Sequence, residues 1–292
     1  MPEQKFEQLF GFLNIYKPIG MTSHDVVAIL RKATKIKQIG HTGTLDPFAQ
    51  GVLPIAIGKA TRLIEFLDDD KEYLAEVSFG KSTDTYDCEG RVVTQSDLKI
   101  TLEQVVAGLK SFEGEILQTP PIYSALKVKG KKLYEYARKG EEVEIEPRKV
   151  TIEKIELKSF DEESQKAKVL IKCSKGTYIR SIAHDLGQNL GVGAHLSELI
   201  RTQAGAFFVE NAIQLEGITI ERIEQHLLMP LDLINLPKLE ISEEEHKKVM
   251  MGQFLQNKNK IKNDENLILV YNNNVNAIAR VEGDLIKVKK VF

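Results

Sequence analysis

Segments with the two-residue repeat of a strand and segments with the spacing of an amphipathic helix follow one another along most of this chain. Residues 73–79 place apolar side chains at every second position, which is the period of a half-buried strand. Val26, Val27 and Leu30 form the apolar stripe of a helix that Thr22 or Ser23 can cap. The sequence therefore predicts a domain that mixes helices and strands, without internal repeats.

The same reasoning places further elements along the chain. Glycines or polar turns bound the apolar runs, and helix starts carry capping residues. Strands are expected over residues 11–16, 51–58, 149–157, 166–173 and 196–202. Helices are expected over 59–67, from Thr101 onward, over 131–139 and over 178–190, and 80–90 is expected to be a polar loop.

The pattern changes around Met229 to Pro237, where Pro230 and Pro237 bracket a linker-like stretch. Beyond it, a short helix begins after Ser242, and strand-like runs over 267–271, 275–281 and 285–291 predict two hairpins. We expect a large domain over residues 1–236 and a small, mostly β module over 237–292. A module of this size is near the lower limit for folding alone.

Composition sets further bounds. The chain has 292 residues, of which 42% are hydrophobic, so it can bury a sizeable core. No apolar run approaches the roughly 20 residues that span a bilayer, and the start Met1-Pro2-Glu3-Gln4-Lys5 lacks a signal-peptide pattern. Cys88 and Cys173 have no partner at disulfide-framework or metal-ligand spacing. A cytoplasmic protein with no membrane contact and no metal is expected.

Basic residues gather in two places, although the net charge is −2. The stretch from Val26 to Leu45 holds four basic residues and no acidic one, and residues 127–139 hold six basic residues against Glu135. Such clusters suit a phosphate backbone, because neutralising phosphates releases counterions. A solvated lysine-rich face gives the same pattern, and charge alone favours that interpretation.

The run Gly40-His-Thr-Gly-Thr-Leu-Asp-Pro47 is the most suggestive loop. Its glycines and its proline can hold the Asp46 carboxylate in a fixed, exposed place, as nucleophilic or acid-base chemistry requires. Aspartate before proline is also a common turn former. From the residues alone the turn is the favoured interpretation.

Five runs of the sequence are considered together. They are Leu13-Asn-Ile-Tyr-Lys-Pro-Ile-Gly-Met-Thr-Ser23, the loop 40–47, Gly51-Val-Leu-Pro-Ile-Ala-Ile-Gly58, Lys71-Glu-Tyr73 and Lys175-Gly-Thr-Tyr-Ile-Arg-Ser-Ile-Ala-His-Asp-Leu-Gly187. In their order and spacing these runs resemble the TruB family of pseudouridine synthases. The resemblance implies an α+β fold of the pseudouridine synthase type. Its parts are a large, mostly antiparallel mixed sheet flanked by helices, a thumb-like RNA-binding insertion at about 120–150, and a small PUA-like RNA-binding module at the C-terminal end, where the match is less clear.

The resemblance also implies an activity and a partner. The family isomerises the uridine at position 55 in the T-loop of transfer RNA, working on a flipped-out base. The partner is then transfer RNA through its T-loop and T-stem, with no cofactor and no obligate protein partner. The expected state is a monomer, and help with tRNA folding is compatible with catalysis.

Site residues carry over position by position. The resemblance implies that Asp46 is the nucleophile, and attack on the base or on the ribose are both open. It implies that Tyr73 stacks on the target base and helps to remove its C5 proton, and that Arg180 keeps Asp46 ionised. Without the resemblance, Tyr73 would be interpreted as a core aromatic and Arg180 as a solvated side chain.

The remaining matches are substrate-binding positions: His41, Tyr178, Leu199, Lys17, Lys131 and Lys132. His41 resembles the family's contact to extruded nucleotides, Tyr178 and Leu199 its uracil pocket, and the lysines at 131 and 132 the basic part of the thumb. Lys17 and Pro18 resemble an element that supports the active-site loop. By themselves, His41 is a surface side chain and Tyr178 and Leu199 are core residues.

Two other functions fit parts of the sequence. One is an RNA-binding or RNA-folding protein without catalysis, against which the joint presence of Asp46, Tyr73 and Arg180 counts. The other is an unrelated enzyme with a nucleophilic aspartate, such as a glycosidase. That function needs a second carboxylate as partner, and no pair stands out in the sequence.

Overall fold

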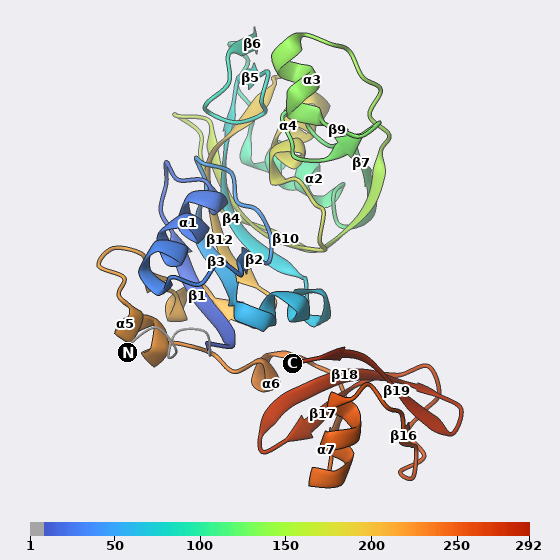
Figure 1. Cartoon of the computed structure of the whole chain (residues 1–292). Helices are drawn as coiled ribbons and strands as arrows, with labels where there is room; N and C mark the ends of the chain where they lie inside the picture. The colour runs from blue at the N-terminus through green and yellow to red at the C-terminus, as the bar shows by residue number, and fades with distance from the viewer. Residues whose placement is uncertain (1–8) are drawn as a thin grey trace.

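A ten-stranded sheet forms the centre of the molecule in the computed structural model, which describes residues 9–292 (Figure 1). Its main path runs β14-β1-β3-β12-β4-β11-β10-β7, with β2 paired to β3 and β13 paired to β12. Neighbours are antiparallel except for β1 with β14 and β3 with β12. The expected large, mostly antiparallel mixed sheet is confirmed. Its strands are β1 (Gly11–Lys17), β2 (Ile39–His41), β3 (Gln50–Ile57), β4 (Lys71–Phe79), β7 (Gly114–Gln118), β10 (Arg148–Asp161), β11 (Lys166–Cys173), β12 (Ala194–Ala204), β13 (Phe207–Phe208) and β14 (Ile213–Gln214).

Helices α1 (Ser23–Thr34), α2 (Leu102–Lys110) and α4 (Ile179–Asn189) pack beside this sheet and bury apolar side chains in its core. Thr22 forms a capping box with Asp25 at the start of α1, and Val26, Val27 and Leu30 are buried as predicted. Gly187 in α4 lies so close to β12 that a Cβ there would be 2.1 Å from the backbone nitrogen of Ala194. The helices are α1 (Ser23–Thr34), α2 (Leu102–Lys110), α3 (Leu133–Lys139), α4 (Ile179–Asn189), α5 (Ile220–Gln225) and α6 (Pro230–Leu233), with a 3-10 helix at Gly58–Phe66 and another at Val209–Asn211.

Three local expectations need correction. The segment expected as a helix over 59–67 is a 3-10 helix. Residues 80–90 are not entirely a loop, because β5 (Lys81–Thr83) pairs with β6 (Val92–Gln95). The basic helix begins at Leu133 rather than at Lys131, because β8 (Lys127–Val128) and β9 (Lys131–Lys132) form a short hairpin that holds both lysines.

A second sheet of five strands follows, in the order β15-β17-β18-β19-β16 (Figure 1). The two predicted hairpins are present as β17 with β18 and β18 with β19. Asn272 and Asn273 both have positive φ, 50° and 57°, as the tight turn between β17 and β18 requires. The elements are β15 (Lys238–Glu240), α7 (Glu243–Met250), β16 (Leu255–Gln256), β17 (Asn266–Tyr271), β18 (Asn274–Glu282) and β19 (Leu285–Val291).

The two sheets meet through an apolar cluster. Phe12 and Val52 of the large sheet belong to the same buried cluster as Ile268 and Ile278 of the small one. A hydrogen bond from Arg62 Nη1 to the carbonyl of Val291, 3.0 Å long, crosses the same junction. The division into domains at 236/237 falls between α6 and β15 and stays a prediction. Residues 1–5, to which the expectation of no export signal referred, lie outside the described residues.

Within residues 9–292, none of the helices has the length and apolarity that crossing a membrane requires.

Candidate active site

A cleft of about 630 Å³ brings together predicted residues from four separate parts of the chain. Asp46 enters it from the loop after β2, Tyr73 from β4, Tyr178 and Arg180 from the start of α4, and Leu199 from β12. β4 and β12 are neighbours in the centre of the sheet, so Tyr73 and Leu199 lie on adjoining strands. The fold therefore assembles these side chains in one place.

The Asp46 loop is fixed by hydrogen bonds from beneath. Ser23, buried at the start of α1, donates its hydroxyl to the carbonyl of Leu45 at 3.1 Å and accepts from the Leu45 N–H at 2.8 Å. The Asp46 carbonyl accepts from the N–H of Ala49 at 3.1 Å. The loop is held on both sides of the carboxylate, so the Asp46 side chain starts from a fixed backbone. That side chain is 36% exposed and faces the cleft.

Arg180 joins the Asp46 loop to the rest of the site. Its Nε lies 3.0 Å from Asp46 Oδ2, its Nη1 donates to Asp87 Oδ2 at 3.2 Å and to the carbonyl of Thr85 at 3.0 Å, and its Nη2 donates to the carbonyl of Tyr123 at 3.0 Å. Arg180 is only 5% exposed. A guanidinium with this many partners is locked in orientation, and it presents one edge to Asp46.

Asp87 is a site residue that the sequence reasoning missed, because it lies in the stretch expected to be a polar loop. It is buried, and besides Arg180 it accepts from the Thr85 hydroxyl at 2.6 Å and from the Glu89 N–H at 3.1 Å. Asp87 thus balances the charge of Arg180. Since its oxygens are engaged and it does not line the cleft, it is no second catalytic carboxylate of the kind that a glycosidase needs.

The charge state of Asp46 reflects opposing influences. Burial raises the pKa of its carboxyl above the ordinary value, and the nearby Asp87 carboxylate raises it further. Arg180 and, more weakly, Lys17 lower that pKa and favour the ionised form. The expectation that Arg180 simply keeps Asp46 ionised needs this refinement, because burial works against it. The carboxylate is consequently less stabilised than one in water, which suits a nucleophile.

Arg201 is the second residue that the sequence reasoning missed. It is 1% exposed on β12, donates from Nε to the carbonyl of Val52 at 2.7 Å and from Nη2 to that of Gly43 at 3.1 Å, and lines the cleft. Gly51 lets β3 approach it, since a Cβ there would lie 2.3 Å from the Arg201 carbonyl. Its place two residues after Leu199, hence on the same strand face, was the available signal.

The aromatic residues of the cleft are held differently. Tyr73 is almost fully buried, and burial raises the pKa of its phenol, which therefore keeps its proton at neutral pH. Tyr178 precedes α4, where its backbone exchanges two hydrogen bonds with the buried amide of Gln118, at 2.8 and 3.0 Å. Backbone contacts thus fix Tyr178, while packing fixes Tyr73.

Lys17 does not belong to the cleft surface, so its placement among the substrate-binding residues is corrected. It is fully buried, and its ammonium donates to the carbonyls of Met21 at 2.6 Å, Pro18 at 2.9 Å and Pro47 at 3.3 Å. Burial lowers its pKa to about 8. The contact to Pro47 ties the residue after Asp46 to β1, which is the supporting role that the Lys17-Pro18 pattern implies.

His41 does not itself line the cleft but directly precedes Thr42, which does. It lies at the end of β2 with its ring 5.5 Å from that of His24. Burial and the neighbouring His24 lower its pKa to about 4, and its Nδ1 has no hydrogen-bond partner among the described residues. The contact of His41 with extruded nucleotides stays a prediction.

The low pKa of His41 predicts a pH-dependent stability. Above the unfolded pKa of about 6.5, His41 is neutral in both the folded and the unfolded state. Between pH 6.5 and 4 it binds a proton in the unfolded chain but not in the folded chain. The free energy of unfolding therefore decreases as the pH is lowered through this range. His41→Gln should lose less stability than the wild type between pH 7 and pH 5, measured by urea unfolding. The exposed His226 provides the control substitution, His226→Gln. Equal pH dependence in all three proteins would contradict the assignment.

Lys131 and Lys132 lie on β9 of the short hairpin and do not line the cleft themselves. The ammonium of Lys132 lies 5.4 Å from the ring centre of Tyr134, which lines the cleft, and that of Lys131 lies 5.4 Å from the ring centre of Tyr136. Tyr136 is buried and donates its hydroxyl to the carbonyl of Val128 at 3.1 Å. The basic segment therefore forms part of the cleft's rim.

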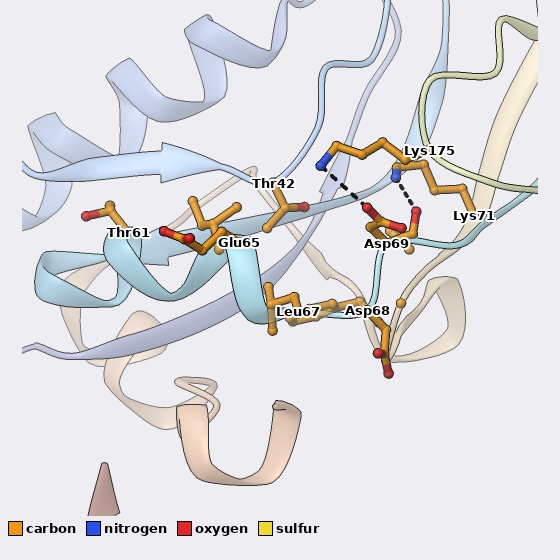
Figure 2. A pocket seen from close by; sticks show the side chains of 12 residues that line it. Thr42, Thr61, Glu65, Leu67, Asp68, Asp69, Lys71 and Lys175 are labelled. Carbon is orange, nitrogen blue, oxygen red and sulfur yellow. Dashed lines mark hydrogen bonds and ion pairs between the residues drawn. The ribbon is translucent and has the colours of Figure 1, made fainter. Parts of the chain in front are cut away.

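A second cavity of about 320 Å³ adjoins the cleft and shares Thr42, Lys71 and Lys175 with it (Figure 2). Both lysines turn toward Asp69: Lys71 donates to its carbonyl at 2.7 Å and Lys175 lies 3.4 Å from its carboxylate. Asp46 and Arg180 line only the larger cleft. The larger cleft is therefore the candidate active site.

Comparisons with known proteins agree on one family. The profile "TruB family pseudouridylate synthase (N terminal domain)" matches residues 31–179, and "tRNA pseudouridylate synthase B C-terminal domain" matches 180–234. The tRNA pseudouridine synthase B of Caldanaerobacter subterraneus is 46% identical over 97% of this chain and 99% of its own length, and that of Streptococcus pneumoniae is 44% identical over the same shares.

Solved structures give the same result for the fold. One described as "Crystal Structure of a Cbf5-Nop10-Gar1 Complex" superposes with a TM-score of 0.73 at 28% identity, covering 100% of this chain and 87% of the other. Another, described as "Structure of H/ACA RNP bound to a substrate RNA containing 2'-deoxyuridine", reaches the same TM-score at 26% identity over the same shares. The fold and the site thus define a pseudouridine synthase. Within that class, the chain belongs to the TruB family.

Proposed function

We propose that this enzyme isomerises the uridine at position 55 in the T-loop of transfer RNA, with Asp46 as its nucleophile. Membership of the family supports uridine isomerisation in tRNA. The observation that carries the assignment of the nucleophile is the Asp46–Arg180 pair, 3.0 Å apart, inside the cleft that Tyr73 and Leu199 also line.

The reaction needs only groups that this cleft offers. The bond between C1′ of the ribose and N1 of the uracil breaks, the uracil turns, and a bond from C1′ to C5 forms. The C5 proton leaves, and the freed N1 gains a proton, so the composition of the nucleoside is unchanged. Asp46 attacks either C1′ or the base to break the first bond and is released when the second is complete. Atoms balance without a redox partner, so the chemistry depends on holding the detached uracil.

Tyr73 is proposed to stack on the uracil while Leu199 and Tyr178 bound its pocket. Extruding a base costs a few kcal/mol, which stacking and edge contacts offset. Because burial raises the pKa of Tyr73, its phenol stays protonated at neutral pH and the phenolate that could act as a base is scarce. This favours stacking over removal of the C5 proton as its main role.

The remaining RNA is proposed to lie along the thumb-like segment 120–150, with the T-stem close to β9 and α3. The basic side chains of this segment and Tyr134 border the cleft, as an RNA-closing element requires. We also propose that the enzyme acts as a monomer in the cytoplasm, that the module over 237–292 adds RNA contacts, and that binding assists tRNA folding.

The activity is tested by incubating the protein with unmodified transfer RNA and mapping pseudouridine along the T-loop. One pseudouridine at position 55 is the expected result. A transfer RNA with cytidine at position 55 is the matched control and should remain unmodified. If every uridine of the natural T-loop stays unchanged, the proposed function fails; modification at another position would overturn its specificity.

Neutralising Lys131 and Lys132 should weaken RNA binding and flatten its salt dependence. Each lost phosphate contact reduces the slope of log K against log salt by about one, so Lys131→Gln with Lys132→Gln should reduce it by up to about two. Lys154→Gln with Lys158→Gln is the control, because both control lysines pair with Glu156 on β10. Equal slopes for the two double variants would place the RNA elsewhere.

A further inference from the structure

The loop between β5 and β6 contains a backbone conformation that needs a physical cause. Tyr86 has a φ of +66°, which a residue with a side chain rarely adopts. Its N–H donates to the carbonyl of Thr83 at 3.3 Å, and its carbonyl accepts from the N–H of Leu196 on β12 at 3.0 Å. The chain thus turns sharply at Tyr86 while the loop stays attached to the large sheet.

This turn serves Arg180. The residues on either side of Tyr86 supply the acceptors for one and the same nitrogen, since Arg180 Nη1 donates to the carbonyl of Thr85 at 3.0 Å and to Asp87 Oδ2 at 3.2 Å. Because the backbone reverses direction at Tyr86, the Thr85 carbonyl and the Asp87 side chain both reach Arg180 Nη1. If Tyr86 relaxed to an ordinary conformation, both acceptors could not stay there.

The side chain of Tyr86 is held by α4, the same helix that carries Arg180. Its ring stacks on the imidazole of His184, with centroids 3.8 Å apart and planes inclined by 14°. His184 follows Arg180 by four residues and therefore lies on the same face of α4, one turn further on. Two consecutive turns of α4 thus grip the loop, one through its acceptors and one through its aromatic ring.

We propose that the Tyr86–His184 stack is a positioning device for the catalytic carboxylate. By holding the left-handed turn at residue 86, the stack keeps Thr85 and Asp87 on Arg180, and Arg180 in turn is kept on Asp46. Neither ring lines the cleft, so both act through Arg180 and not on the substrate. The inference rests on the proposed role of Asp46.

The charges around Asp46 determine how its pKa changes when the Tyr86–His184 stack is lost. The groups that face Asp46 are Arg180 of α4, Asp87 and Glu89 of the β5–β6 loop, Lys17 of β1 and Tyr73 of β4. Of these, Arg180 gives the strongest support to the ionised form. If the stack is lost, Arg180 is no longer held against Asp46. The effect of burial on the Asp46 carboxyl then exceeds that of the guanidinium, and the pKa of the carboxyl rises.

The test compares variants that lose the stack with variants that keep it. Tyr86→Ala and His184→Ala should lower kcat on transfer RNA roughly tenfold to a hundredfold and move the acid limb of the kcat profile to higher pH, with Kd for the RNA unchanged within about twofold. Tyr86→Phe and His184→Phe retain flat rings and should behave as wild type. Tyr86→Gly, which accepts positive φ without strain, should keep more activity than Tyr86→Ala, because the turn is then preserved without the ring.

A second readout needs no turnover. Carbon-13 NMR of aspartate-labelled, RNA-free protein should show a higher pKa for Asp46 in Tyr86→Ala and His184→Ala than in the wild type. Phe160→Ala, which breaks a distant aromatic pair with Phe79, should lower stability and leave that pKa alone. If the proposed function is wrong, the wild type will be inactive on transfer RNA. The titration of Asp46 would still show whether the Tyr86–His184 stack positions Arg180.

Unchanged acid limbs and an unchanged Asp46 pKa in Tyr86→Ala and His184→Ala would overturn the proposal. So would phenylalanine variants that lose as much activity as the alanine variants, because the flat ring alone is the proposed cause.

Discussion

Asp46→Asn should abolish pseudouridine formation while leaving RNA binding within about twofold of the wild type. The amide has the size of the carboxylate and keeps an oxygen toward Arg180, whose charge is still balanced by the buried Asp87. What disappears is the nucleophile, and losing it costs several orders of magnitude, roughly a thousandfold or more in kcat. The measurement is single-turnover conversion of unmodified transfer RNA, with binding followed separately.

Asp69→Asn is the matched control. It makes the same chemical change in the adjoining cavity, where Asp69 pairs with Lys175, and should leave turnover close to the wild-type value. Substantial turnover in Asp46→Asn would remove Asp46 from its assigned role. Loss of RNA binding in that variant would instead show that the carboxylate acts mainly in recognition.

Arg180→Met should impair both stability and catalysis. Arg180 and Asp87 form a buried ion pair at 3.2 Å, with side chains 6% and 5% exposed. Removing one partner of a buried pair leaves the other charge uncompensated, which costs about 3–5 kcal/mol in the free energy of unfolding. Loss of the orientation of Asp46 should lower kcat by roughly a hundredfold. Urea unfolding and single-turnover kinetics measure the two effects independently.

The pH dependence of activity in Arg180→Met should shift in a defined direction. With Asp46 as the proposed nucleophile, activity requires its ionised form. Activity should then be complete above the raised pKa of that carboxyl and be lost as the pH falls through it. Because Arg180 lowers the pKa, its removal moves the acid limb to still higher pH. An acid limb at the wild-type position would mean that another group sets the profile.

Arg91→Met tests the specificity of these effects. Arg91 pairs with Asp84 at 3.3 Å in the same loop region as Asp87, but its side chain is 91% exposed. Exposed pairs contribute only about 0–1 kcal/mol because solvent screens them, so stability and the pH profile should stay as in the wild type. A loss comparable with that of Arg180→Met would point to general disruption of the loop.

The sequence predicted regular elements well where burial imposes a period. The alternation of residues 73–79 marked β4, and the apolar stripe at Val26, Val27 and Leu30 marked α1. Its errors lie where tertiary contacts override local preference. Lys131 and Lys132 read as helix because the following residues do, yet pairing with β8 draws them into a hairpin. β7 has no strong period and gains its identity from pairing with β10.

The candidate site divides in the same manner. Asp46, Tyr73, Arg180, Tyr178 and Leu199 could be named from ordered runs and meet in the cleft. Asp87 could not be named, because a buried charge looks like a surface charge in a sequence until its partner is known. Arg201 was missed for the same reason, and only its place two residues after Leu199 pointed to the cleft. The partners lie far along the chain: Arg180 for Asp87, and the carbonyls of Gly43 and Val52 for Arg201.

The sequence by itself determined the family, the mixture of strands and helices, and the identity of the proposed nucleophile, because these depend on residue types in a fixed order. Only the tertiary structure decided that the buried Lys17 supports the Asp46 loop and that His41 lies beside His24. It also decided that Arg180 donates hydrogen bonds to the residues on either side of Tyr86. The physical reason is that burial and charge pairing act across space. They set the pKa and the orientation of Asp46, which no local pattern encodes.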